Sequence, residues 1–262
     1  MDSILTSISR LFITSVPKKK GSLCSINGKK YELQIHKTIN KCYINNEKFN
    51  KQLEKDLGGC SSSNDLSFIY LNKEYGIEVK KKGSPDWMQC KLIRNDNKWD
   101  YSNKSKIPKE SSKVIVELIN NYEKRTNSKL YNGQIPPFLE RNITYKEWKD
   151  IKLNNSIWND KYISIPKDTI NKVYSSKQCK YIQISDYGLY YLDEDICNFN
   201  VPKFDIEQRI RIRIKVHKTK TSKGWCSLSI MAACQPINIK KLIKSPYSLD
   251  NKDLLPPILI YK

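Results

Sequence analysis

The chain has 262 residues, which is enough for one large domain or two modest ones, each with a buried core. Hydrophobic residues make up 39% of it and aromatic residues 10%, a composition that excludes a chain disordered throughout. The formal net charge of +20, from 47 basic and 27 acidic residues, indicates a polyanionic partner, either nucleic acid or an anionic membrane surface. Codon bias in an AT-rich genome also produces lysine-rich chains, so part of this charge needs no function.

No stretch approaches the roughly 18 apolar residues of a membrane span, so we expect a soluble protein with no membrane partner. The first 21 residues are apolar and Ser-rich and end in three lysines, without the order of a signal peptide, so we expect a first helix or strand there. Eight cysteines are spread along the chain without a Cys-x-x-Cys pair, and we expect reduced, mostly buried thiols. We therefore expect an intracellular protein, cytoplasmic or nuclear, that is not secreted.

In chain order, residues 30–44 favour short strands or a hairpin. The segment from about Asn46 to Leu57 favours a helix, because Phe49, Leu53 and Leu57 share one helical face and a Gly-Gly pair follows. After a Ser-rich loop, DLSFIYLN and YGIEVKKK predict a hairpin that turns at Lys73 and Glu74.

The next segments complete a compact module. DWMQCKLIRND, opened by Pro85 and Asp86, favours a short helix, and KWDYS favours a strand. SSKVIVELINNYEKR predicts an amphipathic helix whose apolar residues fall on one face. These residues are Ile115, Leu118, Ile119 and Tyr122. The pattern predicts an α/β fold with a mixed central sheet flanked by helices.

From about Trp158 the sequence becomes rich in strand-forming segments: YISIP, KYIQISDYGLYYL, QRIRIRIKVHK and WCSLSIMAAC. They form either a β-rich C-terminal subdomain or an extension of the first sheet. We place the α/β core in residues 1–155 and a β-rich DNA-binding or recognition region in residues 156–262.

The chemistry is expected in the predicted hairpin. Asp65 begins one strand and Glu78 lies within the next, so the two carboxylates can meet across the pair. The alternation of side chains along a strand puts Glu78 and Lys80 on one face, with Val79 turned to the core. Two converging carboxylates and a lysine are what metal-assisted phosphodiester cleavage needs, because Mg²⁺ prefers oxygen ligands and a lysine can orient water or stabilise charge.

This stretch resembles the PD-(D/E)xK nuclease superfamily, which has the restriction-endonuclease-like fold. The resemblance implies Asp65 and Glu78 as Mg²⁺ ligands and Lys80 as the catalytic lysine. It also implies a role for Gln89, on the helix after the lysine strand, and an additional acidic residue, Glu54 or Glu47, on the preceding helix. Asn64 stands where the family's motif has a proline.

Two basic segments are candidates for DNA contact. Lys81 and Lys82 follow the catalytic lysine and could bind phosphates, or simply protect an exposed sheet edge. In QRIRIRIKVHK, four cations alternate with apolar residues and form a cationic ladder on one strand face. The ladder consists of Arg209, Arg211, Arg213 and Lys215.

Each segment has an alternative interpretation. Glu78 and Lys80 could be an ion pair on a solvated hairpin. The ladder could be neutralised by acids that are close in sequence, namely Asp193, Glu194, Asp195, Asp205 and Glu207. His36 and His217 have no partner visible in the sequence and receive no role.

The leading hypothesis is a Mg²⁺-dependent endonuclease acting on double-stranded DNA, with a restriction-type role favoured over a homing or repair role. If each chain carries one active site, cutting both strands suggests a homodimer. The alternatives are a non-catalytic nucleic-acid-binding protein that uses Arg209 to Lys215, and a structural or host-interacting protein whose charge reflects genome composition.

Overall fold

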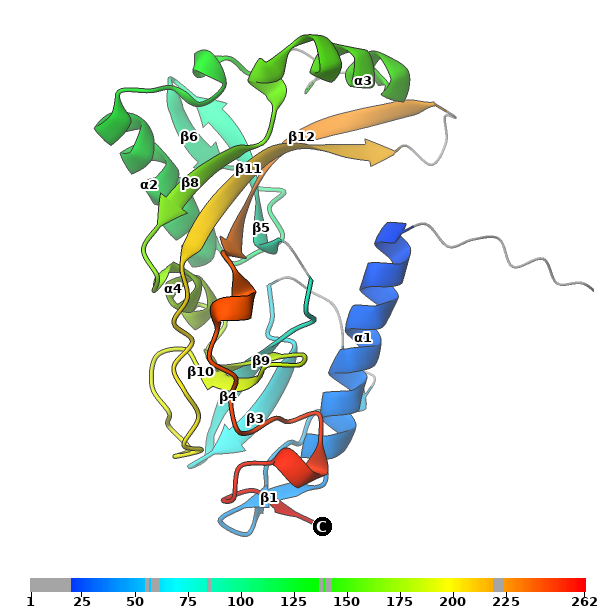
Figure 1. The fold of residues 1–262 in the computed structure, drawn as a ribbon, viewed down its shortest axis with the longest axis vertical. Coiled ribbons are helices and arrows are strands. Elements are labelled where there is room, and N and C mark those ends of the chain that lie inside the picture. Colours follow the sequence, from blue (N-terminus) through cyan, green and yellow to red (C-terminus); the bar gives the residue numbers. More distant parts are fainter. Residues whose placement is uncertain are drawn as a thin grey trace, which may run out of the picture.

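The computed structural model describes residues 20–54, 57, 62–83, 86–136, 139, 143–218 and 224–262. The described residues form four α-helices and three sheets (Figure 1). In chain order the elements are α1 (Lys20–Ile39), β1 (Cys42–Ile44), β2 (Glu47–Lys48), β3 (Leu66–Tyr70), β4 (Lys73–Lys80), β5 (Trp87–Asn95), β6 (Lys98–Tyr101), α2 (Lys109–Thr126), β7 (Ile143–Thr144), α3 (Tyr145–Asn154), β8 (Lys161–Ile165), α4 (Thr169–Ser175), β9 (Cys179–Ile184), β10 (Gly188–Tyr191), β11 (Gln208–Lys218), β12 (Trp225–Pro236) and β13 (Ile260–Tyr261).

The sheets differ in size and in the direction of their strands. The four-stranded sheet has the order β10-β9-β4-β3 and is mixed, because β4 runs parallel to β9 and the other pairs are antiparallel. The largest sheet has the order β6-β5-β12-β11-β8, with β7 attached to β12, and its pairs are all antiparallel. A small sheet joins β13, β1 and β2. The protein is therefore a mixed α/β protein in which strands predominate, as the predicted fold class requires at this coarse level.

The two larger sheets interleave the early and late parts of the chain. β4 pairs with β9 in one sheet, and β5 pairs with β12 in the other. A boundary at residue 155 stays a prediction, but both sheets contain strands from either side of that position.

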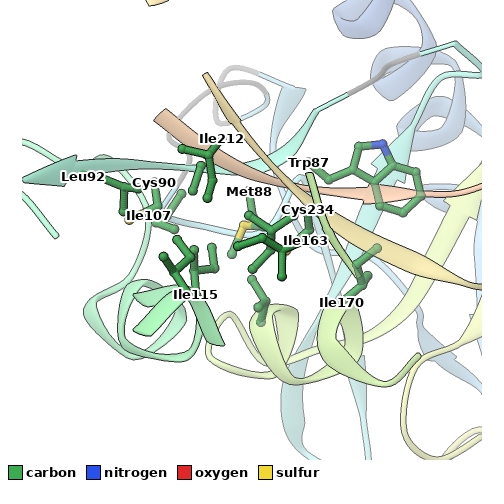
Figure 2. Packing of buried hydrophobic residues seen from close by; sticks show 14 of the residues in the cluster. Trp87, Met88, Cys90, Leu92, Ile107, Ile115, Ile163, Ile170, Ile212 and Cys234 are labelled. Atoms are coloured by element: carbon green, nitrogen blue, oxygen red, sulfur yellow. The ribbon is translucent and has the colours of Figure 1, made fainter. Parts of the chain in front are cut away.

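Two apolar cores hold these layers together. In the first, buried residues of β5, β11 and β12 pack against α2 and α4 (Figure 2). Ile115 and Ile119 of α2 are fully buried there, and Leu118 and Tyr122 pack at its edge, which confirms the predicted amphipathic helix. The second core lies between α1 and the four-stranded sheet. The four-stranded sheet contributes to both cores, because Ile182 of β9 belongs to the first and Tyr181 of β9 to the second.

The predicted hairpin is confirmed. β3 and β4 pair from Leu66↔Ile77 to Tyr70↔Lys73. The turn lies at Leu71 and Asn72, which have φ of 48° and 58°, two residues earlier than predicted. Two successive positive φ values belong to the tight hairpin turn whose twist matches that of paired strands.

The segment 30–44 was predicted to form strands, and for most of its length this is wrong. Helix α1 continues to Ile39, and only Cys42–Ile44 is a strand. Tyr31, Ile35 and Ile39 are all buried. Their spacing of four residues is that of one helical face, so the segment buries its apolar residues as a helix rather than as strands.

The predicted helix at about residues 46–57 is also wrong within the described residues. Glu47–Lys48 is strand β2, joined to β1 through Asn45 and Asn46, whose φ values are 50° and 64°. Phe49 is buried, whereas Leu53 is 56% exposed, so the two residues do not share a buried helical face. The predicted Gly-Gly stop, like the predicted first element in residues 1–19, lies outside the described residues.

The segment after Asp86 forms strand β5, so the predicted helix there is wrong. Cys90 and Leu92 are buried while Gln89 and Lys91 are half-buried, which is the alternation of a strand. The segment pairs with β6 on one side and β12 on the other. Pairing with a strand more than a hundred residues away overrides its local preference.

The remaining predicted strands are confirmed as β6, β8, β9, β10, β11 and β12. Six cysteines whose side chains the structure describes are buried and form no disulfide with one another, as expected. Among the described residues, no helix combines the length and the apolar character needed to cross a membrane.

Helix α1 is fixed to the C-terminal segment by a buried polar network. The Tyr31 hydroxyl donates to Asp250 Oδ2 (2.7 Å) and accepts from Gln183 Nε2 (3.1 Å). Gln183 also donates to Ser248 Oγ (2.7 Å) and accepts from the backbone N–H of Leu249 (3.0 Å). This network sets the position of α1 beside β9.

We expect Tyr31→Phe to lower the free energy of unfolding by about 1–2 kcal/mol, because it removes the hydroxyl that bonds both Asp250 and Gln183. Urea denaturation measures the change. Tyr261→Phe is the matched control, since Tyr261 is 40% exposed. Equal effects of the two substitutions would show that the network does not hold α1.

Candidate active site

Asp65 and Glu78 meet at one ammonium group. Lys80 Nζ contacts Asp65 Oδ2 at 3.5 Å and forms a short hydrogen bond with Glu78 Oε1. It also donates to the carbonyl oxygen of Val79 (3.2 Å). The structure thus brings the three predicted residues together, and both carboxylates face the same cation.

The hairpin register explains this convergence. Pairing of Leu66 with Ile77 brings Asp65, just before β3, next to β4. Asp65 Oδ2 also accepts from the backbone N–H of Val79 (2.9 Å), which fixes the carboxylate. Ile77 and Val79 face the second core, as predicted from alternation. Asp65 is therefore held by backbone as well as by charge.

Glu78 is buried rather than exposed, and a second lysine contacts it. Glu78 is 2% exposed, and its Oε2 contacts Lys177 Nζ at 3.1 Å. Lys177 lies between α4 and β9, and the parallel pairing of β4 with β9 carries it to the cluster. The ring of Tyr174 lies 5.6 Å from Lys80 Nζ and 5.5 Å from Lys177 Nζ. An ion pair on a solvated hairpin does not describe this site.

The site is electrostatically coupled. Burial raises the pKa of the Glu78 carboxyl, and the Asp65 carboxylate raises it further, while Lys80 and Lys177 oppose both effects. Burial alone would lower the pKa of the Lys80 ammonium. The Glu78 and Asp65 carboxylates outweigh burial and keep that pKa above its ordinary value. Lys80 therefore remains a cation at neutral pH.

Glu32 of α1 is a third carboxylate at this site, and it was not predicted. It lines the same cleft as Asp65 and Glu78. Burial, followed by repulsion from Asp65, raises the pKa of Glu32 to about 7. The predicted extra acids do not join the site, since Glu47 and Glu54 are exposed and do not line the cleft.

We expect Glu32→Gln to change how stability depends on pH. The pKa of Glu32 in the folded protein, about 7, lies above its ordinary value of 4.5. Its contribution is therefore complete below the ordinary value and is lost as pH rises through the folded value. Because Glu32 is half-exposed, we expect the Gln variant to gain at most about 1 kcal/mol relative to the wild type between acidic and alkaline pH.

Urea denaturation at both ends of that range measures this difference, with Glu47→Gln as the exposed control. Parallel pH profiles for wild type and Glu32→Gln would contradict the raised pKa of Glu32.

Gln89 lies on strand β5 rather than on a helix, so its predicted structural setting is wrong. Its side chain nevertheless lines the same cleft as Glu78 and Lys80. Gln89 Oε1 accepts from Lys215 Nζ at 3.0 Å. Gln89 therefore connects the cleft to the end of the cationic ladder.

The cleft has a volume of about 800 Å³ and is bordered by α1, β4, β5, β11 and β12. Among the described residues that line it, four are acidic: Glu32, Asp65, Glu78 and Asp86. The lining also contains His217 and eight lysines: Lys29, Lys80, Lys81, Lys91, Lys104, Lys106, Lys177 and Lys215. Lys81 thus faces the cleft, whereas Lys82 pairs with Asp186 at 3.5 Å and is not among the lining residues.

The cationic ladder has the predicted alternation. Ile210, Ile212 and Ile214 are buried, and the four cations are half-buried on the other face. Of these cations, only Lys215 is among the described residues that line the cleft.

The ladder's partners are not the acids close in sequence. Arg211 contacts Asp160 (Nη2–Oδ2, 2.5 Å) and Asp86 (Nη1–Oδ1, 3.3 Å), and Arg213 contacts Asp86 (Nη2–Oδ2, 2.7 Å). Arg209 donates to Gln235 and lies 4.3 Å from the ring of Tyr162. The ladder is therefore partly neutralised by residues that are distant in sequence.

The donor atoms fit a hard divalent cation. Asp65 and Glu78 offer carboxylate oxygens, and Mg²⁺ is typically held by one or two carboxylates with water and substrate phosphate completing its shell. Lys80 Nζ already places one positive charge between the two carboxylates. Within the described ranges, no three His, Cys, Asp or Glu side chains gather into a complete metal site. Asp65 and Glu78 could hold Mg²⁺ together with water and a phosphate.

Comparisons with protein-family models, with curated protein sequences and with solved structures found no match for this chain.

Proposed function

We propose that the protein is a Mg²⁺-dependent endonuclease that hydrolyses phosphodiester bonds of double-stranded DNA. The observation that carries the proposal is the convergence of Asp65 and Glu78 on Lys80 inside a lysine-lined cleft. A carboxylate pair provides oxygen ligands for the metal, and the lysines provide contacts for the phosphates of the backbone.

Each residue has a role in this proposal. A bound Mg²⁺ supplies charge neutralisation on the scissile phosphate and a hydroxide nucleophile near neutral pH. Asp65 and Glu78 hold the metal, with Asp65 fixed by the Val79 N–H. Lys80 stabilises the charge that develops on the phosphate. Lys177 contacts the other oxygen of the buried Glu78 carboxylate and opposes the rise of its pKa.

We also propose that the chain belongs to the PD-(D/E)xK superfamily and has its restriction-endonuclease-like core. Three features support this extension: an Asp at the start of β3, a Glu-Val-Lys run in β4, and the mixed sheet in which β4 lies parallel to β9. A restriction-type role suits the large antiparallel sheet, which could grip a duplex beside the cutting site. A homodimer follows if each chain cuts one strand.

One observation favours a second candidate, a non-catalytic nucleic-acid-binding protein. Both oxygens of Glu78 are already paired with lysines, Oε1 with Lys80 and Oε2 with Lys177. An acid balanced in this way can be purely structural. In that case the lysine-lined cleft would bind nucleic acid without cutting it.

Incubation of supercoiled plasmid with the purified chain separates the two candidates. A nuclease converts the plasmid to nicked or linear forms in Mg²⁺ and leaves it intact in EDTA. A binding protein retards the plasmid in a gel but leaves it intact in both conditions. Intact plasmid in Mg²⁺ over a range of pH and salt would overturn the nuclease proposal.

A further inference from the structure

The large sheet forms one wall of the cleft, and its cleft-facing side chains come from three neighbouring strands. We define the sheet wall as Lys91 of β5, Ser227 and Ser229 of β12, and Lys215 and His217 of β11. In the register of β11 and β12, Lys215 lies opposite Ser229 and His217 lies opposite Ser227. Met231 of β12, which lies opposite Lys91, also lines the cleft. The sheet wall thus carries two lysines, a histidine and two hydroxyls, with the apolar Met231 beside Lys91.

This surface lacks negative charge. Asp86, the acid that lines the cleft nearest the ladder, is already engaged by Arg211, Arg213 and the amide of Gln235. Within the described part of the chain, no carboxylate forms an ion pair with Lys91, Lys215 or His217. Cations gathered without acids favour a bound anion.

Neutral hydrogen bonds hold these groups in place. Lys215 Nζ donates to Gln89 Oε1 at 3.0 Å, and His217 Nε2 lies 2.6 Å from Ser229 Oγ. The first contact orients the Lys215 cation without neutralising it, and the second fixes the His217 imidazole, whose lowered pKa leaves it neutral at neutral pH. Lys215 therefore keeps its charge available to a ligand in the cleft.

The mutual repulsion of these groups supports the same conclusion. Burial lowers the pKa of His217, and Lys215 and Lys91 lower it further. Burial lowers the pKa of Lys215, and Arg213 adds to this effect against the opposing charge of Asp86. A phosphate on the sheet wall would relieve this repulsion.

We propose that the sheet wall is a phosphate-binding subsite for the nucleic-acid backbone, separate from the carboxylate cluster. The inference rests on the proposed function, because it takes the carboxylate cluster as the place of the scissile phosphate. The sheet wall then holds another phosphate of the same substrate. The substrate must therefore be a polynucleotide, with at least one phosphate besides the one that is cut.

Binding of a short DNA duplex in EDTA, followed by fluorescence anisotropy over a series of salt concentrations, tests the subsite. The test variant is Lys91→Gln/Lys215→Gln, and the control is Lys98→Gln, an exposed lysine of β6 in the same sheet. Loss of two phosphate contacts should lower the affinity about tenfold and reduce the slope of log K against log salt by about 1.8. The control should keep the affinity and slope of the wild type.

Lys91→Gln/Lys215→Arg restores one charge and should recover about half of the lost slope. Because the slope reports released counterions, a variant that merely loses packing would not move it in this graded way. Wild-type affinity and slope in both double variants would overturn the subsite.

Protonation of His217 gives an independent readout. The charged groups around it are Lys215 on its own strand and Lys91 on β5, with Ser229 on β12 between them. Since these lysines lower the pKa of His217 and a phosphate would raise it, binding should be accompanied by proton uptake. DNA affinity should therefore rise more steeply with falling pH in the wild type than in His217→Gln. Identical pH profiles would remove His217 from the subsite.

Failure of this inference can be told apart from failure of the proposed function. DNA binding that weakens in the double variant, together with intact plasmid in Mg²⁺, would support the subsite and overturn the nuclease. Cleavage in Mg²⁺ with an unchanged KM in the double variant would support the nuclease and overturn the subsite. If both hold, the double variant raises KM and leaves kcat close to that of the wild type.

Discussion

Glu78→Gln should lower the rate of Mg²⁺-dependent DNA cleavage by at least about 100-fold, the scale of losing one charge-stabilising contact in an active site. The amide keeps the size of the side chain but removes the negative charge that the metal requires. DNA affinity in EDTA should stay equal or rise slightly, because one negative charge leaves a cleft lined by lysines.

Glu74→Gln is the matched control, since Glu74 lies on the same strand and is exposed. It should cut DNA at the wild-type rate. If Glu78→Gln cuts as fast as Glu74→Gln, the cluster does not hold the catalytic metal. The pair Lys80→Met and Lys73→Met tests the lysine in the same way, because Lys73 is the exposed first residue of β4.

Lys177→Met should destabilise the fold by about 3 kcal/mol, because it removes one partner of a buried ion pair. The side chains of Lys177 and Glu78 are each 3% exposed, so water cannot replace the lost contact. Chemical denaturation at neutral pH measures the change. Lys172→Met is the control, because Lys172 pairs with Asp168 on the exposed face of α4.

The destabilisation by Lys177→Met should depend on pH, because Lys177 affects the pKa of Glu78. Lys177 lowers the pKa of Glu78, so its removal raises that pKa still further above the ordinary value of 4.5. The loss should therefore be largest above the folded-state pKa of Glu78 and shrink as pH falls through it, because the carboxyl is then protonated in both folded proteins. Glu78→Gln/Lys177→Met should be less destabilised than Lys177→Met, because no buried carboxylate is left with one partner removed. Strictly additive effects would mean that the two residues are not coupled.

The hairpin of β3 and β4 could be predicted from local sequence because its signals are local. Alternating apolar residues define β3 and β4, and strand alternation places Glu78 and Lys80 on one face. Since both strands are close in sequence, a single turn is sufficient to bring Asp65 to the same ammonium.

The rest of the site depends on contacts that are distant in sequence. Lys177 is 99 residues from Glu78, and it reaches Glu78 only because β9 joins the sheet parallel to β4. Nothing in its neighbourhood indicates this role. Glu32 did have a usable signal, because Tyr31, Ile35 and Ile39 repeat every four residues and place Glu32 beside a buried helical face.

The contacts of the cationic ladder were likewise not predictable from nearby sequence. Its strand and its faces follow from alternation, but its acidic partners, Asp86 and Asp160, come from segments 125 and 51 residues away from Arg211. The contact between Asp86 and Arg211 could not be expected from the sequence, because the segment after Asp86 was predicted to be a helix outside the large sheet. Tertiary pairing with β12 decided the structure of that segment.

The most direct test of the central claim is a titration of Mn²⁺ as a spectroscopic substitute for Mg²⁺, followed by electron paramagnetic resonance in the presence of duplex DNA. Wild type, Glu78→Gln and Glu74→Gln should be compared. If Asp65 and Glu78 hold the metal, wild type and Glu74→Gln bind Mn²⁺ and Glu78→Gln does not. Equal Mn²⁺ binding by all three proteins, or none by a wild type that still cuts DNA, would contradict the proposed site.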